Sequence, residues 1–201
     1  MKETSDMQEV KDHARLLYNP EEVESALDRM AGELAAKVSH SNPILLAVMN
    51  GGLILLGMLL PRLDFPLRVD YLHATRYRER TFGTDLQWKK TPEYSLAGET
   101  VVVVDDILDE GYTLKAIVDY CKEQGAAQVI SVVLVQKIHQ RGNDMTADIV
   151  GLTTPDEYLF GYGMDYKGYW RNASGIYFID VGYHVIIFQK GAILCSEPAR
   201  Y

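Results

Sequence analysis

This sequence has few cysteines, no long hydrophobic run and no excess of positive charge. The two cysteines, Cys121 and Cys195, are too few for a disulfide framework in a chain of 201 residues. The apolar runs 44–49 and 53–60 are short and separated by Asn50-Gly51-Gly52, so neither predicts a membrane span or a signal peptide. We therefore expect a cytoplasmic protein with no membrane partner.

The charge balance excludes a further class of partner. Lysine and arginine together number 20 against 28 aspartates and glutamates, a formal net charge of -8. Such a chain is not expected to bind nucleic acid, and a polyanionic substrate would need Mg²⁺ and a few well-placed cations. The composition, 47% hydrophobic and 24% charged, is that of an ordinary globular protein, and we expect residues 1–201 to form a single domain.

The segment 101–114 is the most informative part of the chain. Four valines, Val101–Val104, predict a strand buried on both faces, as in a parallel sheet. Asp105 and Asp106 then stand at the carboxyl end of that strand, where open α/β sheets bind ligands. A helix is expected to follow directly, because four apolar residues recur at helical spacing: Leu114, Ile117, Val118 and Cys121.

This succession of strand, acidic turn and helix suits a sugar phosphate. Backbone N–H groups of residues 109–113 would face a phosphate at the helix N-terminus, and the Thr113 hydroxyl adds a donor. Asp105 and Asp106 can accept hydrogen bonds from sugar hydroxyls or hold a hydrated Mg²⁺. The alternative is a solvated acidic turn without a ligand.

The same segment resembles the phosphoribosyl pyrophosphate signature of type I phosphoribosyltransferases. In that signature four hydrophobic residues, two acids and two further hydrophobic residues precede Asp-Thr-Gly-x-Thr. The resemblance implies an α/β fold with a central, mostly parallel sheet flanked by helices, and a small hood subdomain. It implies that ribose is bound by Asp105 and Asp106. It also implies that the phosphate is bound by the turn Asp109, Glu110, Gly111, Tyr112 and Thr113. Because Glu110 replaces the usual threonine, its carboxylate must turn outward and leave at most a backbone contact.

Other elements can be placed by their patterns. Asn19-Pro20-Glu21-Glu22 predicts a helix start, and residues 1–17 are expected to be a loose or partly helical lead. Further strands are predicted at 44–49, 67–73, 129–135 and 176–179, and a helix at 53–60.

Asn50-Gly51-Gly52 follows the strand at 44–49. It is either a tight turn or, as the resemblance implies, the loop that binds pyrophosphate through Asn50 and Gly51, with a cis peptide bond between Met49 and Asn50. Family members carry lysine where this chain has Asn50, so a neutral amide replaces a charge.

Residues 74–98 show no helical period and carry several basic residues. A loop of this length predicts a mobile lid, and the resemblance places Tyr77 at its pyrophosphate contact. A solvated hairpin is the alternative.

The nucleobase side of the site is implied by two later segments. Lys137 follows the strand at 129–135 and matches the lysine that hydrogen-bonds a purine 6-oxo group, while Arg141 matches a pyrophosphate contact. His139, between them, is expected to be a surface residue. Residues 155–180 resemble the base-binding hood of hypoxanthine-guanine phosphoribosyltransferases. In that comparison Tyr158 stacks on the base, Leu159 reads its edge, Asp165 is a Mg²⁺-side carboxylate and Arg171 contacts pyrophosphate.

Together these resemblances cover a core of about residues 20–180 and leave the tail 183–201 unassigned. They imply a purine salvage enzyme that joins hypoxanthine or guanine to phosphoribosyl pyrophosphate. Mg²⁺ would be held by Asp105, Asp106 and Asp165, and Asp109 would be the general base for the purine N7 proton. A homodimer or homotetramer is expected. The alternatives are selectivity for xanthine or a pyrimidine, and a non-catalytic nucleotide sensor.

Overall fold

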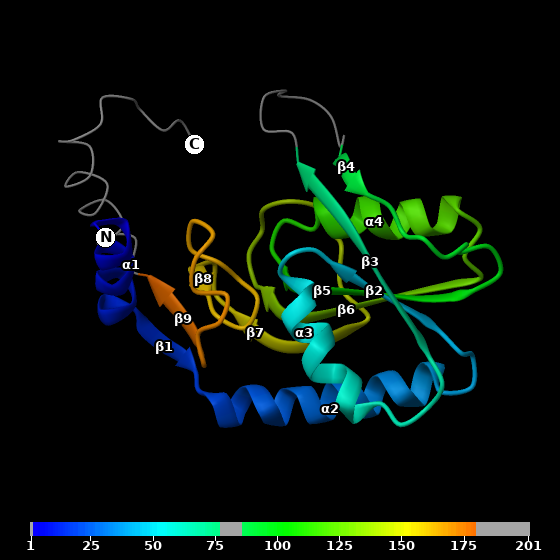
Figure 1. Ribbon diagram of the computed structural model, residues 1–201, viewed down its shortest axis with the longest axis horizontal. Helices are drawn as coiled ribbons and strands as arrows, with labels where there is room; N and C mark the ends of the chain where they lie inside the picture. The colour runs from blue at the N-terminus through cyan, green and yellow to red at the C-terminus, as the bar shows by residue number, and fades with distance from the viewer. Residues whose placement is uncertain (1, 77–85, 180–201) are drawn as a thin grey trace.

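The computed structural model describes residues 2–76 and 86–179, so Tyr77 and the tail 183–201 lie outside the described residues. A six-stranded sheet has the strand order β4-β3-β2-β5-β6-β7, and a three-stranded sheet has the order β1-β9-β8 (Figure 1). The strands are β1 (Arg15–Tyr18), β2 (Ile44–Val48), β3 (Arg68–Arg76), β4 (Leu86–Lys90), β5 (Thr100–Leu108), β6 (Gln128–Lys137), β7 (Ile149–Thr154), β8 (Tyr158–Phe160) and β9 (Ile176–Ile179). The helices are α1 (Lys2–His13), α2 (Pro20–Val38), α3 (Gly52–Leu59), the 3-10 turn η1 (Leu60–Arg62) and α4 (Tyr112–Glu123).

The large sheet forms the middle of three layers. Helices α2 and α3 cover one face and α4 covers the other (Figure 1). Strands β3, β2, β5, β6 and β7 are parallel, and β4 is antiparallel to β3. Along β5, Val102 and Val104 pack in the α2 and α3 layer, whereas Val101 and Val103 pack in the α4 layer. The valine run is therefore buried on both faces, and the predicted fold class is confirmed.

Helix α2 begins where the sequence predicts. The Asn19 side chain accepts a hydrogen bond from the Glu22 backbone N–H (2.9 Å), and the Glu22 carboxylate accepts one from the Asn19 N–H (2.8 Å). This capping box satisfies two backbone donors that the first turn leaves without a helical partner. The apolar face of α2 packs on the sheet through Leu27, Met30 and Leu34, which are fully buried.

The hood is built from residues near both ends of the described chain. Strand β1 pairs antiparallel with β9, so Leu16 lies opposite Tyr177. Helix α1 packs beside them, and Met7 and Val10 are buried with Phe160 (Figure 1). The predicted hood, 155–180, therefore lacked residues 2–18, and the strand within the lead 1–17 was not predicted. Four residues with no periodic pattern carry too little local signal to identify an edge strand.

Part of the predicted lid is regular structure. Strands β3 and β4 form an antiparallel pair in which Thr75 lies opposite Gln87. Trp88 of β4 packs on Tyr120 of α4, with ring centroids 4.4 Å apart. The described part of the segment 74–98 therefore contains a pair of strands and is not a loop throughout, whereas its role as a mobile lid stays a prediction.

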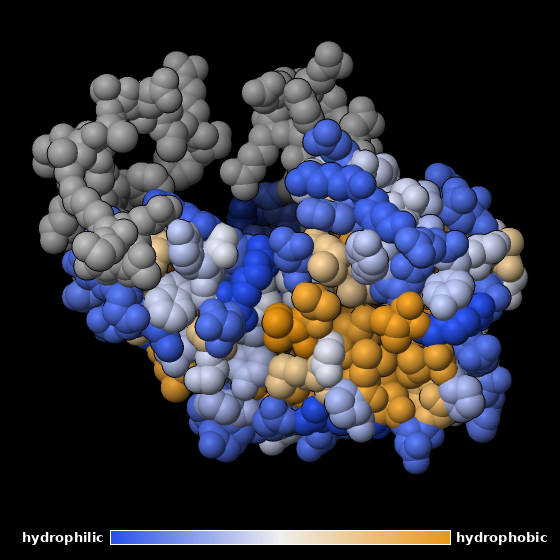
Figure 2. Space-filling view, viewed as in Figure 1, coloured by the Kyte–Doolittle hydropathy of each residue, from blue (hydrophilic) through white to orange (hydrophobic). Residues whose placement is uncertain are grey.

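One apolar surface is left uncovered by the residues that the structure describes. Figure 2 shows a hydrophobic patch over α3, where Leu53, Val69, Tyr71 and Tyr94 are between 43% and 51% exposed and line a hollow of about 510 Å³. We call these four residues the α3 patch. Within the described part of the chain, no helix is long and apolar enough to cross a membrane.

Candidate active site

A cavity of about 380 Å³ opens at the carboxyl ends of β2, β5 and β6. It collects side chains from most of the segments that the sequence singled out. The predicted site residues that line it are Asn50, Gly51, Asp105, Asp106, Asp109, Thr113, Lys137, Tyr158, Leu159, Asp165 and Arg171. Residues far apart in the chain therefore converge where open parallel sheets bind ligands.

The acidic turn forms a second hollow of about 250 Å³ beside this cavity, lined by residues 105–114 and so including Glu110, Gly111 and Tyr112. Gly111 is the N-cap of α4 and has a positive φ of 80°, a conformation that glycine adopts without strain. Gly111 has no side chain that could accept hydrogen bonds from the first backbone N–H groups of α4. These groups can therefore bind an anion such as a phosphate.

The Glu110 side chain is held by Arg141. Its Oε1 lies 3.4 Å from Nη1 of the arginine. The positive charge of Arg141 therefore partly offsets the charge of a carboxylate that lies beside the proposed phosphate site.

Asp105 and Asp106 form a crowded acidic pair. Asp106 is only 8% exposed, and its backbone N–H donates to Oδ1 of Asp105 (2.9 Å). Burial raises the pKa of both carboxyl groups, and the charge of Asp106 further raises the pKa of Asp105. Arg171 approaches Asp106 at 4.0 Å. A bound cation or sugar hydroxyls would stabilise the ionised pair.

The predicted pyrophosphate loop lies directly against this pair. The peptide bond between Met49 and Asn50 is cis, as the resemblance implies. A Cβ atom at Gly51 would overlap the Asp106 carboxylate, and one at Gly52 would overlap the Val104 carbonyl oxygen. The two glycines are therefore needed for the loop to approach the end of β5 closely.

The carboxylates predicted to hold Mg²⁺ all line the cavity, but they do not converge on one point. Among the described residues, the one group of three side chains close enough to share an ion is Asp109, His139 and Asp156. Asp165 is instead paired with Arg171 at 2.5 Å. Mg²⁺ usually binds one or two protein carboxylates together with water and substrate oxygens, so Asp105 and Asp106 alone fit such an ion.

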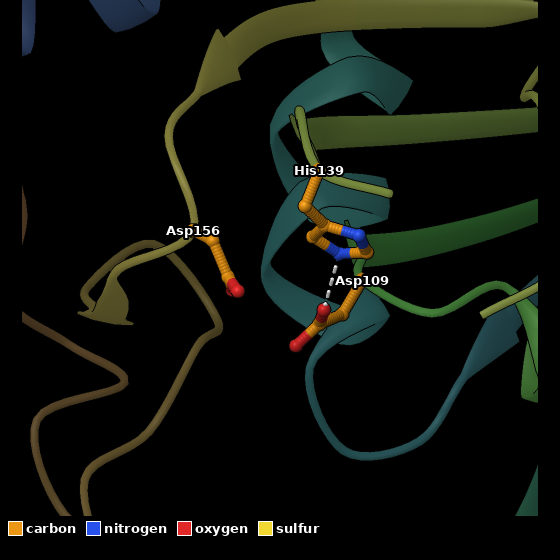
Figure 3. A group of neighbouring side chains, drawn as sticks. All are labelled: Asp109, His139 and Asp156. Atoms are coloured by element: carbon orange, nitrogen blue, oxygen red, sulfur yellow. Dashed lines mark hydrogen bonds and ion pairs between the residues drawn. The ribbon is translucent and has the colours of Figure 1, made fainter. Parts of the chain in front are cut away.

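Asp109 is surrounded by hydrogen-bond donors. Lys137 Nζ lies 2.9 Å from its Oδ2, and His139 Nε2 lies 2.8 Å from its Oδ1 (Figure 3). Burial raises the pKa of Asp109, but Lys137, His139 and Arg141 together lower it by more than burial raises it. The pKa therefore lies below its ordinary value. The carboxylate is consequently ionised at neutral pH and able to accept a proton.

The interpretation of His139 as a surface residue is wrong. Its side chain is 9% exposed and bonded to Asp109, whereas the neighbouring Ile138 is 60% exposed. Residues two apart point to the same side of an extended chain. The spacing of Lys137 and His139 could therefore have indicated that His139 faces the site together with Lys137.

Arg141 is not brought to the pyrophosphate loop. The β6–β7 loop folds back over the acidic turn, where the Asn143 N–H donates to the Glu110 carbonyl oxygen (3.0 Å). This path places the Arg141 guanidinium on Asp156 (2.6 Å) and near Asp109 (3.4 Å). Arg141 does not line the cavity that Asn50 and Arg171 line.

The predicted base-binding residues do meet. Lys137 and Tyr158 line the same cavity, and Leu159 of β8 is buried beside them. The Lys137 side chain is 10% exposed and lies between Asp109 and Asp156, at 2.9 and 3.6 Å. An ammonium has three donors, so Lys137 can hydrogen-bond a ligand oxygen as well as a carboxylate.

Comparison with known proteins identifies the family and the fold. The family model described as phosphoribosyl transferase domain matches residues 14–167. A hypoxanthine-guanine phosphoribosyltransferase of Aquifex aeolicus is 30% identical over 83% of this chain and 94% of the relative. A solved hypoxanthine phosphoribosyltransferase of Staphylococcus aureus is 24% identical, covers 87% of this chain and 96% of its own, and shares the fold with a TM-score of 0.81. The bifunctional protein TilS/HprT of Listeria monocytogenes is 31% identical over 80% of this chain, which spans only 25% of that protein's length.

Proposed function

This chain belongs to the phosphoribosyl transferase domain family, and from that premise we propose that it is a purine salvage enzyme. The reaction joins hypoxanthine or guanine to the anomeric carbon of phosphoribosyl pyrophosphate, forms IMP or GMP and releases pyrophosphate. The observation that carries the proposal is the single cavity lined by Asp105, Asp109, Lys137 and Tyr158. One end of that cavity suits a ribose phosphate, and the other presents a donor and an aromatic ring to a purine.

The chemistry follows from the charges around the cavity. The bond between the anomeric carbon and pyrophosphate breaks as the base attacks, which leaves an oxocarbenium-like ribose. Asp105 and Asp106 accept hydrogen bonds from the ribose hydroxyls, and their negative charge stabilises the positive ring. Arg171 stabilises the departing pyrophosphate. The Arg171 guanidinium is held by Asp165 (2.5 Å) and donates to the Gly163 carbonyl oxygen (2.5 Å).

At the base end, two side chains divide the work. Lys137 donates to the 6-oxo group, which selects a 6-oxopurine. Asp109 accepts the N7 proton as the new bond forms at N9, because it is the ionised carboxylate beside Lys137 in the cavity. Lys137 now lies on Asp109, so binding of the base shifts a donor from the carboxylate to the substrate.

Mg²⁺ would be held by Asp105 and Asp106 together with substrate oxygens, and when bound it would neutralise charge on the pyrophosphate group. The acidic cavity and the net charge of -8 make such a counter-ion necessary for a polyanionic substrate.

We also infer a homodimer or homotetramer that acts in the cytoplasm. The α3 patch supports assembly, because apolar side chains that remain exposed on a surface of this kind are typical of subunit contacts. The free, buried thiol of Cys121 suits a reducing compartment.

The test is an assay of the purified chain with phosphoribosyl pyrophosphate, Mg²⁺ and one base at a time. We expect pyrophosphate release and a nucleoside monophosphate with hypoxanthine and guanine, and neither product with orotate. Efficient turnover of xanthine would broaden the specificity. Nucleotide binding without pyrophosphate release with any base would instead identify a non-catalytic sensor and refute the proposal.

A further inference from the structure

His139 lies outside the cavity lining, yet it contacts the carboxylate that the reaction uses as its base. We propose that His139 is a positioning residue: its Nε2–H holds Oδ1 of Asp109, so that Oδ2 remains directed at the purine. This inference rests on the proposed function, since it concerns how Asp109 is held during proton transfer.

The hydrogen bonds around the ring determine its tautomer. The Arg141 backbone N–H lies 3.1 Å from Nδ1 of His139, and a backbone N–H can only donate. Nδ1 must therefore be the ring nitrogen without a proton. The single ring proton is then on Nε2, which lies 2.8 Å from Oδ1 of Asp109 and donates to it (Figure 3).

The two partners differ in how firmly they are placed. The His139 side chain is 9% exposed, whereas the Asp109 side chain is 40% exposed and stands in a turn. Packing alone does not restrain a carboxylate that is this accessible, so its orientation depends on its hydrogen bonds. A buried ring locked at both nitrogens is a rigid support for it.

The two oxygens of Asp109 have different neighbours. Oδ2 is bonded to Lys137 (2.9 Å), and Lys137 is the group expected to turn toward the 6-oxo oxygen of the base. Oδ1 keeps His139 and has Arg141 at 3.4 Å. When the base binds, Oδ2 is therefore the oxygen that becomes free to take the N7 proton.

A shared metal ion is the other use for Asp109, His139 and Asp156, whose ligand atoms lie within 4.8 Å of one another. The surrounding cations argue against it. Arg141 lies 2.6 Å from Asp156, and Lys137 lies between the two carboxylates. An ion would have to displace both cations and the Nε2 proton, so the cluster is better described as a hydrogen-bonded network.

The first test compares substitutions at position 139. His139→Ala removes the donor, whereas the side-chain amide of His139→Gln can donate from a position close to Nε2. Gln140→Ala, an exposed neighbour, is the matched control. For His139→Ala we expect kcat to fall about tenfold to a hundredfold, because a slightly misplaced catalytic group costs that much, with KM for the base changed less than threefold. His139→Gln should recover most of the loss, and Gln140→Ala should match the wild type.

Melting temperature and affinity for GMP, measured on each variant, show whether the fold and the cavity persist. Unchanged kcat in His139→Ala, or a folded His139→Gln variant as slow as His139→Ala, would overturn the positioning role alone. A wild-type chain that forms no nucleotide with any base would overturn the proposed function, and this inference with it.

The tautomer can be observed independently of activity. Long-range ¹H–¹⁵N spectra distinguish the two neutral forms of a histidine ring, and the His139→Gln spectrum assigns the signal among the five histidines. We expect the Nε2–H form. An Nδ1–H form would contradict the proposed hydrogen bond to Asp109.

Discussion

At the scale of single residues, Asp105 and Asp109 are two carboxylates of one turn region whose environments act in opposite directions. Burial and the charge of Asp106 raise the pKa of Asp105, whereas Lys137, His139 and Arg141 outweigh burial and lower the pKa of Asp109. A carboxyl group whose pKa rises on folding reduces stability when it is ionised, and a carboxyl group whose pKa falls on folding adds to stability when it is ionised.

Asp105→Asn should therefore stabilise the protein while it impairs catalysis. The substitution removes a poorly solvated charge and keeps the oxygen that accepts the Asp106 N–H. We expect about 1 kcal/mol of extra stability, or roughly 2–4 °C in Tm, at pH 7–8 in EDTA. The gain should shrink as the pH falls toward 4, because the wild-type carboxyl is then protonated in the folded state as well. Calorimetry across this pH range measures it, and a lower Tm at pH 8 would contradict the pKa direction.

Asp109→Asn should have the opposite effect on stability and a larger effect on turnover. The amide cannot accept the N7 proton, so kcat should fall on the order of 10²–10⁴-fold with GMP affinity largely retained. Tm should fall at neutral pH, because the ionised carboxylate stabilises the fold above its unfolded pKa and this contribution is lost as the pH falls through its lower folded pKa. Steady-state kinetics and GMP calorimetry separate the two effects. Near-normal turnover would show that the general base is another group.

At the scale of elements, α2 offers two substitutions of opposite sign. Asn19→Ala removes the capping box and should cost about 1 kcal/mol. Gly32→Ala, at an exposed position where a Cβ meets no atom within 4 Å, should add about 1 kcal/mol through lower backbone entropy in the unfolded chain. Urea unfolding of both variants measures the free energies. If both substitutions changed the free energy of unfolding in the same direction, the described capping of α2 or the open position of Gly32 would be wrong.

Helix α4 supplies a further element-scale prediction. Cys121 is fully buried beneath the helix, and burial raises the pKa of its thiol to about 11. We expect Cys121 to remain unmodified by iodoacetamide at pH 8 in the native protein and to react after denaturation. Peptide mapping in a Cys195→Ser background gives the readout. Rapid native labelling would show that α4 opens readily.

At the scale of the whole molecule, the α3 patch predicts self-association. Val69→Glu would place a charge among the patch residues, and we expect it to lower the mass measured by light scattering from that of an oligomer to that of a single chain. Lys37→Glu, on the exposed surface of α2, is the control and should leave the mass unchanged. A monomeric wild type would refute the proposed assembly.

The site residues whose position could be predicted from the sequence lie between segments with a clear strand or helix pattern. The turn from Asp109 to Thr113 lies between a valine-rich strand and an amphipathic helix, so its place at the sheet edge follows from neighbouring residues alone. Lys137 and Tyr158 had to be located by resemblance to a family, since nothing in their own neighbourhoods shows that they face one cavity. The role of Asn50 in place of a lysine stays a prediction.

Residue order alone was enough to predict the elements that have a strong local pattern, because backbone preferences, alternation and capping act over a few residues. It therefore predicts the β5 strand, the start of α2 and the anion-ready end of α4. The folded structure was needed to show that β1 completes the hood and that the β6–β7 loop carries Arg141 to Asp156 and His139 to Asp109. These contacts join residues distant in the chain, and their distances depend on strand order and on the path of an irregular loop, which no local pattern specifies.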